Sequence, residues 1–210
     1  MLIDPKANKV RGVAKLTKKD ARSSTGLFLL EGPQGLKEAL DRPKLIVELY
    51  ATEDAVARYP DLFERAENAR IQVQLVSEPV LKALTDTTTP QGVVAVCEQI
   101  DVTLQDIIDA KPQLVALLAN IRDPGNAGTV LRAADAAGAD AVVLSDSSVD
   151  IYNPKVVRST TGSLFHLPVV TGLDVEATIE RLYAEFGITA EATVAAAKAL
   201  LSMAQAMLRI

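Results

Sequence analysis

The chain is poor in the residues that build disulfide frameworks, metal clusters and aromatic surfaces. Its 210 residues include one cysteine, one histidine and no tryptophan, and aromatic residues make up 4%. One cysteine cannot form an internal disulfide, and one cysteine with one histidine cannot form a Cys/His metal cluster. The sequence therefore predicts no metal site. Cys97 lies in the apolar run GVVAVC and is predicted to be a buried strand residue.

Long apolar runs are absent as well. The longest have the length of a strand, and the first residues show no secretory signal pattern. We therefore expect no membrane span and a cytoplasmic protein. The hydrophobic content of 49% is rich in Ala, Val and Leu, which suffices for the core of one large domain or two small ones.

Negative charge dominates, with a formal net charge of −5, and a uniform distribution would argue against a nucleic-acid-binding protein. The basic residues are not uniform, because many of them gather near the N-terminus against only Asp4 and Asp20. A local basic patch still attracts phosphate, since salt screens the field beyond roughly 10 Å. The alternative is a solvated, partly frayed terminus. The candidates are Lys6, Lys9, Arg11, Lys15, Lys18, Lys19 and Arg22.

Strands and helices alternate through the first hundred residues. FLLEGPQGLKEAL indicates a strand, a glycine turn and a helix, and residues 54–69 have a helical pattern. Ser77 is placed to cap a helix that begins with Glu78 and Pro79. Further strands are predicted in LIVELYAT, VQLVS and GVVAVCEQI. Residues 101–112 are polar and helical until Lys111-Pro112, so we predict two domains, 1–105 and 112–210.

The second half repeats the alternation. PQLVALLAN is a predicted strand, DPGN a turn, and Ala127–Ala137 a helix with Gly138 at its end. AVVLSD, NPKVVRSTTGS and LFHLPVV follow as strand, helix and strand. This order predicts a parallel sheet with right-handed crossovers. Val130, Leu131 and Ala134 are expected to cover that sheet.

Asn126 and Arg132, which follow the predicted strand PQLVALLAN, invite a functional interpretation, and each also has a simpler alternative. Asn126 suits a helix N-cap, and Arg132 could pair with Asp135 three positions further along the helix. The loop DPGNAG lacks the G-x-G-x-x-G spacing, so a nucleotide-dependent doubly wound enzyme is a weaker hypothesis.

The segments NIRDPGNAGTVLRAADAAG and NPKVVRSTTGSLFHLPVV resemble the SpoU (TrmH-like) RNA 2′-O-methyltransferases. The resemblance implies an α/β fold: a C-terminal parallel-sheet domain of the trefoil-knot methyltransferase type, preceded by a smaller α/β L30e-like domain. It also implies S-adenosylmethionine as cofactor, rRNA or tRNA as substrate, and a homodimer formed through the C-terminal domain.

The same resemblance assigns catalytic roles to Arg132, which helps activate the ribose 2′-hydroxyl, and to Asn126, which helps hold the site together. An arginine stays protonated, with a pKa above about 12. Arg132 is therefore expected to stabilise charge and orient phosphate rather than act as a free base.

The resemblance extends to RNA-binding candidates. Arg122 matches the family's first motif, and Arg122 and Arg158 are both candidates to touch RNA phosphates, although exposed surface charges fit them equally well. In the L30e-like unit, Thr88 and Gln91 belong to a loop suited to hydrogen-bond a folded RNA, or simply to a turn before a strand. The resemblance gives His166 no role, and we predict a structural one.

The resemblance fails where the cofactor should bind. The family's glycine-asparagine-glutamate loop and I-P-x-x-G segment are not found, as if tens of residues were absent between Phe186 and Ala190. Thr193, in what resembles the last motif, remains as a cofactor-binding candidate. If the sequence is incomplete here, the protein is an ordinary methyltransferase. If the deletion is genuine, it is a non-catalytic RNA-binding paralogue without a cofactor pocket.

Overall fold

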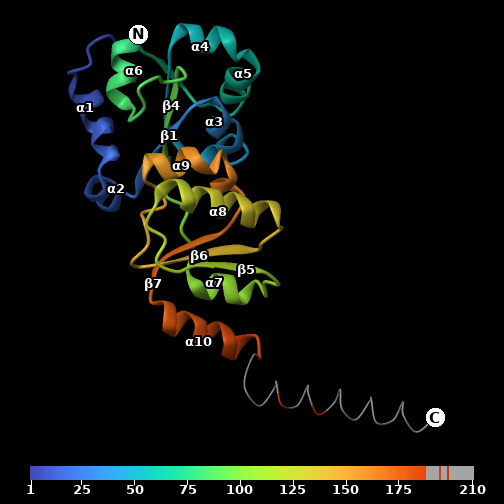
Figure 1. Ribbon diagram of the computed structural model, residues 1–210. Helices are drawn as coiled ribbons and strands as arrows, with labels where there is room; N and C mark the ends of the chain where they lie inside the picture. Colours follow the sequence, from blue (N-terminus) through green and yellow to red (C-terminus); the bar gives the residue numbers. More distant parts are fainter. Residues whose placement is uncertain (188–193, 195–197, 199–210) are drawn as a thin grey trace.

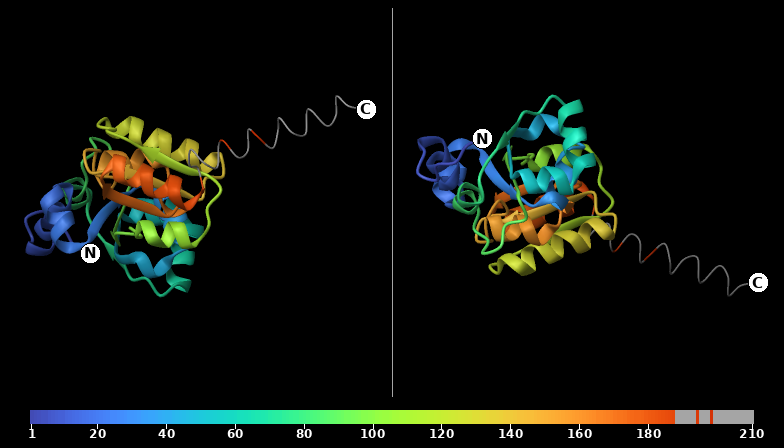
Figure 2. Two further views of the ribbon diagram at one scale, coloured as in Figure 1. Left: turned by 90° about the horizontal axis from the view of Figure 1, so that it is seen from below. Right: turned by 90° about the horizontal axis from the view of Figure 1, so that it is seen from above.

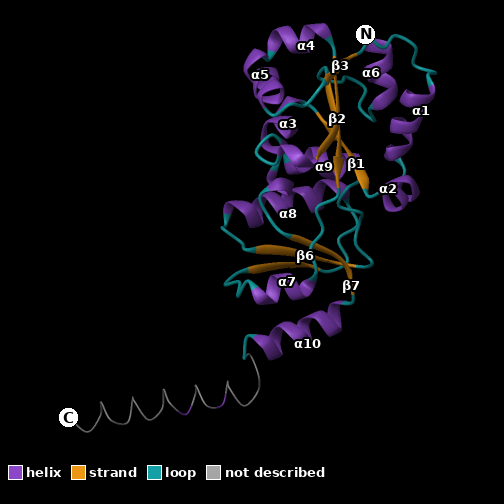
Figure 3. Ribbon diagram, turned by 180° about the vertical axis from the view of Figure 1, so that it is seen from behind, coloured by secondary structure: helices purple, strands orange, loops and turns teal. Residues whose placement is uncertain are grey.

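The computed structural model describes residues 1–187, 194 and 198, and its secondary structure falls into two α/β halves (Figure 1). Each half has its own sheet, of four strands in the first and three in the second. The strands of the two sheets run in clearly different directions (Figure 3). Within the described residues, no helix is long and apolar enough to cross a membrane.

The first sheet has the order β1-β4-β2-β3, with β1 at Leu27–Glu31, β4 at Val93–Glu98, β2 at Ile46–Ala51 and β3 at Val73–Leu75. Strand β4 is antiparallel to both of its neighbours, whereas β2 and β3 are parallel. Cys97, in β4, is fully buried, as predicted, and burial raises the pKa of its thiol to about 12.

Helices cover both faces of this sheet. On one face lie α1 (Asn8–Ala14) and α6 (Glu78–Leu84), with α2 (Lys19–Thr25) beside them. The other face is covered by α3 (Pro33–Ala39), α4 (Glu53–Arg58) and α5 (Pro60–Asn68). The single helix predicted over 54–69 is wrong, because Pro60 keeps Tyr59 out of the helical conformation and splits it in two. Ser77 is the N-cap residue of α6, as predicted.

The second sheet confirms the predicted parallel arrangement. Its order is β5-β6-β7, with β5 at Val115–Leu118, β6 at Ala141–Ser145 and β7 at Val169–Leu173. Helices α8 (Pro124–Ala136) and α9 (Pro154–Thr160) cover one face. The other face carries α7 (Leu104–Asp109) and Leu182 of α10 (Val175–Glu185).

Two predictions for this half are wrong. The strand expected from Leu164 begins only at Val169, because Thr161 and Gly162 take left-handed conformations and lead into a 3-10 turn, Ser163–Phe165. Val130 is 39% exposed instead of covering the sheet. Helix α8 buries Ala127, Gly128, Leu131 and Ala134, a stripe that leaves position 130 outside.

The two halves share one hydrophobic cluster. The ring of Phe28 in β1 lies 4.9 Å from that of Tyr152 and 6.3 Å from that of Phe165, measured between centroids. Helix α9 lies between β1 and α8, and Figure 2 shows α8 and α9 side by side. The first half is thereby packed directly against the helical face of the second.

Candidate active site and RNA-binding surface

The loop after β5 is shaped by serines of the loop after β6. Asn120 has a left-handed backbone (φ 59°), and its N–H donates to Oγ of Ser145 at 3.0 Å. Ser148 accepts from the Ile121 N–H at 3.3 Å and donates to the carbonyl of Leu118 at 3.2 Å. The carboxyl ends of β5 and β6 are thus tied together, at the edge of a parallel sheet where ligands ordinarily bind.

Helix α8 starts from this loop and carries both catalytic candidates. Its N-cap is Asp123, whose carboxylate accepts from the Asn126 N–H at 2.8 Å, so the predicted alternative that Asn126 caps the helix is wrong. Asn126 and Arg132 are both exposed. At about 100° per residue they lie roughly 120° apart around the axis and about 9 Å apart along it. The alternative pairing of Arg132 with Asp135 is not formed, because Asp135 contacts His166 instead.

The basic residues near the N-terminus divide into one buried and several exposed members. Arg22 is 2% exposed and donates to Asp150 at 2.9 Å through Nε and to the Leu16 carbonyl at 2.8 Å, so its predicted RNA contact is wrong. Its charge neutralises a carboxylate from the other half. The remaining members are exposed on α1, α2 and the residues around them, with Lys9 near Glu48 at 3.7 Å: Lys6, Lys9, Arg11, Lys15, Lys18 and Lys19.

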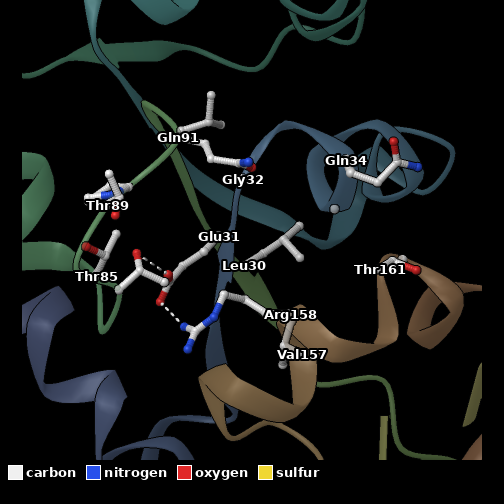
Figure 4. Close-up of a pocket in the computed structure, with 15 residues that line it drawn as sticks. Leu30, Glu31, Gly32, Gln34, Thr85, Thr89, Gln91, Val157, Arg158 and Thr161 are labelled. Atoms are coloured by element: carbon white, nitrogen blue, oxygen red, sulfur yellow. Dashed lines mark hydrogen bonds and ion pairs between the residues drawn. The ribbon is translucent and has the colours of Figure 1, made fainter. Parts of the chain in front are cut away.

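A pocket of about 300 Å³ brings two other RNA candidates together (Figure 4). Gln91, from the first half, and Arg158, from α9, both line it. Arg158 donates to Glu31 at 3.1 Å. Thr88 is exposed on the same loop without lining the pocket, and Arg122 is exposed in the loop after β5.

His166 connects three segments. Its Nδ1 lies 2.8 Å from Asp135 of α8, and its Nε2 lies 3.3 Å from Glu38 of α3. The hydrogen bond with Asp135 raises the pKa of His166; partial burial opposes this, and Glu38 reinforces it. For Asp135, burial raises the pKa, but hydrogen bonds from Ser163 and His166 outweigh it and leave a lowered value. These contacts favour a structural histidine.

The described residues do not complete a cofactor site. A polar pocket at the carboxyl ends of β6 and β7, which includes Ser145, Asp146 and Gly172, has a volume of about 170 Å³. Small-molecule sites typically need about 300–1,000 Å³. Thr193 lies outside the described residues, as does most of the chain after Phe186 where the missing segment is expected. No group of side chains in the described part could hold a metal ion.

The contacts between the two halves that sequence reasoning missed are made by acidic side chains. Glu31, Glu38 and Asp150 each hold a basic side chain of the other half. Glu31 stood in the quoted segment FLLEGPQGLKEAL, but nothing local indicated its partner. These pairs join residues more than a hundred positions apart, and helix or strand periodicity relates only residues that are close in the sequence.

Two family models match consecutive parts of the chain. Residues 29–102 match the model for RNA 2′-O ribose methyltransferase substrate binding, and residues 113–207 match the SpoU rRNA Methylase family.

Among curated proteins, the chain is 41% identical over 165 residues to the 23S rRNA (guanosine(2553)-2′-O)-methyltransferase RlmP of Bacillus subtilis. The match covers 79% of this chain and 62% of that relative, so the chain spans less than two thirds of its length.

Solved structures share the fold. An AdoMet-bound rRNA methyltransferase from Sinorhizobium meliloti superimposes with a TM-score of 0.73 at 28% identity, covering 88% of this chain and 68% of that one. An RNA 2′-O ribose methyltransferase gives a TM-score of 0.67 at 30% identity, with coverage of 84% and 67%.

Proposed function

The chain belongs to the SpoU rRNA methylase family, and we propose that it methylates a ribose 2′-hydroxyl of ribosomal RNA with S-adenosylmethionine as methyl donor. The observation that carries this proposal is the strand–loop–helix unit from β5 to α8, which exposes Asn126 beside the carboxyl edge of a parallel sheet and Arg132 about 9 Å further along the helix. We assign RNA binding to residues 1–105 and methyl transfer to residues 112–210.

In this proposal Arg132 acts on the nucleophile. A ribose hydroxyl is a poor nucleophile until its proton is hydrogen-bonded or removed, and a guanidinium remains charged at neutral pH. Placed beside the ribose, it stabilises negative charge developing on the 2′-oxygen and orients the neighbouring phosphate. Asn126, in the first turn of α8, holds the loop and ribose in place.

RNA docking is assigned to the exposed basic residues of α1 and α2, with Arg122 nearer the methylated ribose. We also propose a homodimer through the C-terminal half. The outer face of α8 exposes Val130 at 39%, and Ala133 and Ala137 are exposed on the same side of the helix, the side that carries Asn126. A second copy covering this apolar strip would bring further groups to the site.

The test is transfer of a labelled methyl group to unmodified 23S rRNA, followed by digestion to nucleosides. We expect a 2′-O-methylated nucleoside from the unaltered chain and at least a hundredfold lower rate for Arg132→Ala, as for removal of one charge-stabilising donor. Arg58→Ala, which removes an exposed arginine of α4, is the matched control and should keep the rate. Methylation of a base would contradict the ribose assignment.

The 170 Å³ pocket favours a second candidate, the RNA-binding paralogue that has lost its cofactor site. Calorimetric titration with S-adenosylmethionine separates the two. Cofactor binding supports the methyltransferase, whereas RNA binding that weakens steeply with salt, without any cofactor binding, supports the paralogue.

A further inference from the structure

The 300 Å³ pocket between the two halves has walls from three segments (Figure 4). The turn from β1 to α3 supplies Glu31, Gly32 and Gln34, and the loop before β4 supplies threonines and Gln91. Helix α9 and its end supply Arg158, Thr161 and Gly162. The lining combines hydroxyl, amide and peptide groups with the Glu31 carboxylate, one guanidinium on the side of the C-terminal half, and apolar side chains such as Leu30 and Val157.

Glu31 fixes two of these walls at once. Its side chain is 5% exposed, and it accepts hydrogen bonds from the Asp86 N–H and the Thr87 hydroxyl, both at 3.2 Å. Its third partner is Nη1 of Arg158, at 3.1 Å. A buried carboxylate is costly unless it is paired and hydrogen-bonded, so these contacts fix the position of the loop before β4 relative to helix α9.

Arg158 keeps capacity for a ligand. A guanidinium has five N–H donors, and Glu31 accepts from one of them; the side chain remains 28% exposed. A partly exposed guanidinium held in one orientation can donate two parallel hydrogen bonds to a phosphate.

The opposite wall can read a base. Thr89 and Gln91 are exposed, and each offers both a donor and an acceptor. Gly32 has φ 92°, and a Cβ there would lie 2.9 Å from Oε1 of Gln91, so glycine lets that amide approach the turn.

We propose that this pocket binds one unstacked nucleotide of the substrate RNA, with its base against Thr89 and Gln91 and its phosphate against Arg158. The volume is at the lower end for small-molecule sites, which suits one nucleotide and excludes a duplex. Proteins read RNA sequence mainly from such splayed-out bases, through hydrogen bonds to their edges. The choice of RNA rests on the proposed function.

The basic surface leads to this pocket. Helix α1, which carries Lys9 and Arg11, packs on α6, and α6 runs into the loop of residues 85–91. An RNA strand whose phosphates bind along α1 would therefore reach the pocket, and the pocket would select which of its nucleotides binds there.

Photo-cross-linking locates the bound nucleotide without relying on activity. Fragments of 23S rRNA carrying 4-thiouridine in one preparation and 6-thioguanosine in another are bound to the full chain and irradiated. We expect cross-linked peptides from residues 85–91 and 154–162. Cross-links confined to α1 and α2 would overturn the proposal.

Variants provide a second, independent readout, the affinity for the same RNA. Gln91→Ala should weaken binding by roughly 5- to 150-fold, as expected for the loss of one amide–base contact. Gln72→Ala removes an exposed glutamine from the same half and should have no effect. Arg158→Gln should lower the slope of log affinity against log salt by about 0.7, the value for one phosphate contact on a single strand.

The outcomes separate the two proposals. Equal affinities of Gln91→Ala and Gln72→Ala overturn the pocket, whatever the methyl-transfer assay gives. Failure of methyl transfer with the cross-links in place overturns the proposed reaction and leaves the pocket standing. Circular dichroism of each variant shows whether a variant with lower affinity for RNA is still folded.

Discussion

His166 shows how one side chain can bind two halves of a protein together. Its ring lies between Asp135 of α8 and Glu38 of α3, at 2.8 Å and 3.3 Å. A protonated imidazole donates from both nitrogens, whereas a neutral one donates from only one. The bridge is therefore complete only while His166 carries its charge.

This charge makes the bridge sensitive to pH. Because Asp135 raises the pKa of His166 above its unfolded value near 6.5, the stabilisation is fully present below pH 6.5 and is lost as pH rises through the higher folded-state pKa. We predict that His166→Gln lowers the free energy of unfolding more at pH 6 than at pH 9, measured by urea denaturation. An equal loss at both values would contradict the charged bridge.

The residue scale also separates what the sequence could predict from what it could not. Asn126 and Arg132 were predicted as catalytic because they match the first motif of the family that the sequence resembles, and that motif lies within one short stretch of the chain. The burial of Arg22 could not be foreseen, since its partner Asp150 is 128 positions away. The same holds for Glu31 and Arg158, at 127 positions. Local patterns identify charges, and only the fold determines which of them are neutralised.

At the scale of elements, the contact between α8 and α9 depends on one glycine. A Cβ on Gly128 would lie 1.8 Å from Oγ of Ser159 and 2.8 Å from its backbone carbonyl carbon. Ser159 is itself fixed, because its hydroxyl is within hydrogen-bonding distance of the carbonyls of Pro124 at 3.1 Å and Val156 at 2.8 Å. The helices could admit a methyl group only by moving apart.

We therefore predict that Gly128→Ala destabilises the protein, although alanine is favoured in a helix by about 1 kcal/mol. Overpacking costs about 1–3 kcal/mol, and the cost here is toward the upper end because the added methyl group meets backbone as well as side-chain atoms. After the gain in helix propensity is subtracted, we expect the free energy of unfolding to fall by on the order of 2 kcal/mol. Gly12→Ala is the matched control: it lies in α1 with no atom within 4 Å of the added Cβ and should gain up to about 1 kcal/mol. Denaturant titration of both variants gives the comparison, and a stabilised Gly128→Ala would refute the close contact.

The boundaries of elements were predictable where local chemistry sets them and not where packing does. Gly138 follows α8 with φ 71°, as its residue type indicates, and Ser77 is at the N-cap position of α6, although its side chain makes no capping hydrogen bond. The start of β7 was predicted too early. Leu164 and Phe165 are apolar and were therefore assigned to the strand, but both are buried in the 3-10 turn that precedes it. Burial of consecutive residues comes from the first half of the chain packing onto this segment.

At the scale of the whole molecule, the two sheets behave as parts of one core. Phe28 contacts Tyr152 and Phe165 across the junction, and the hydroxyl of Tyr152 donates to Asp101 at 2.8 Å while accepting from the Ile100 N–H. Burial raises the pKa of this phenol, and the carboxylate of Asp101 adds to the effect. The segment that joins the halves is thus anchored to the second half, which disfavours independent motion of the two sheets.

A shared core predicts a single unfolding transition. Phe165 is 3% exposed, and Phe165→Ala should cost about 3–5 kcal/mol through lost burial and the cavity left behind. If the halves unfold together, native-state hydrogen exchange of amides in β4 and in β6 should accelerate by the same factor, because both then report global opening. Tyr183→Ala, at a 51% exposed position on α10, should leave both unchanged. Faster exchange in β6 alone would mean that the halves open separately, and the pocket between them could then close only when RNA is bound.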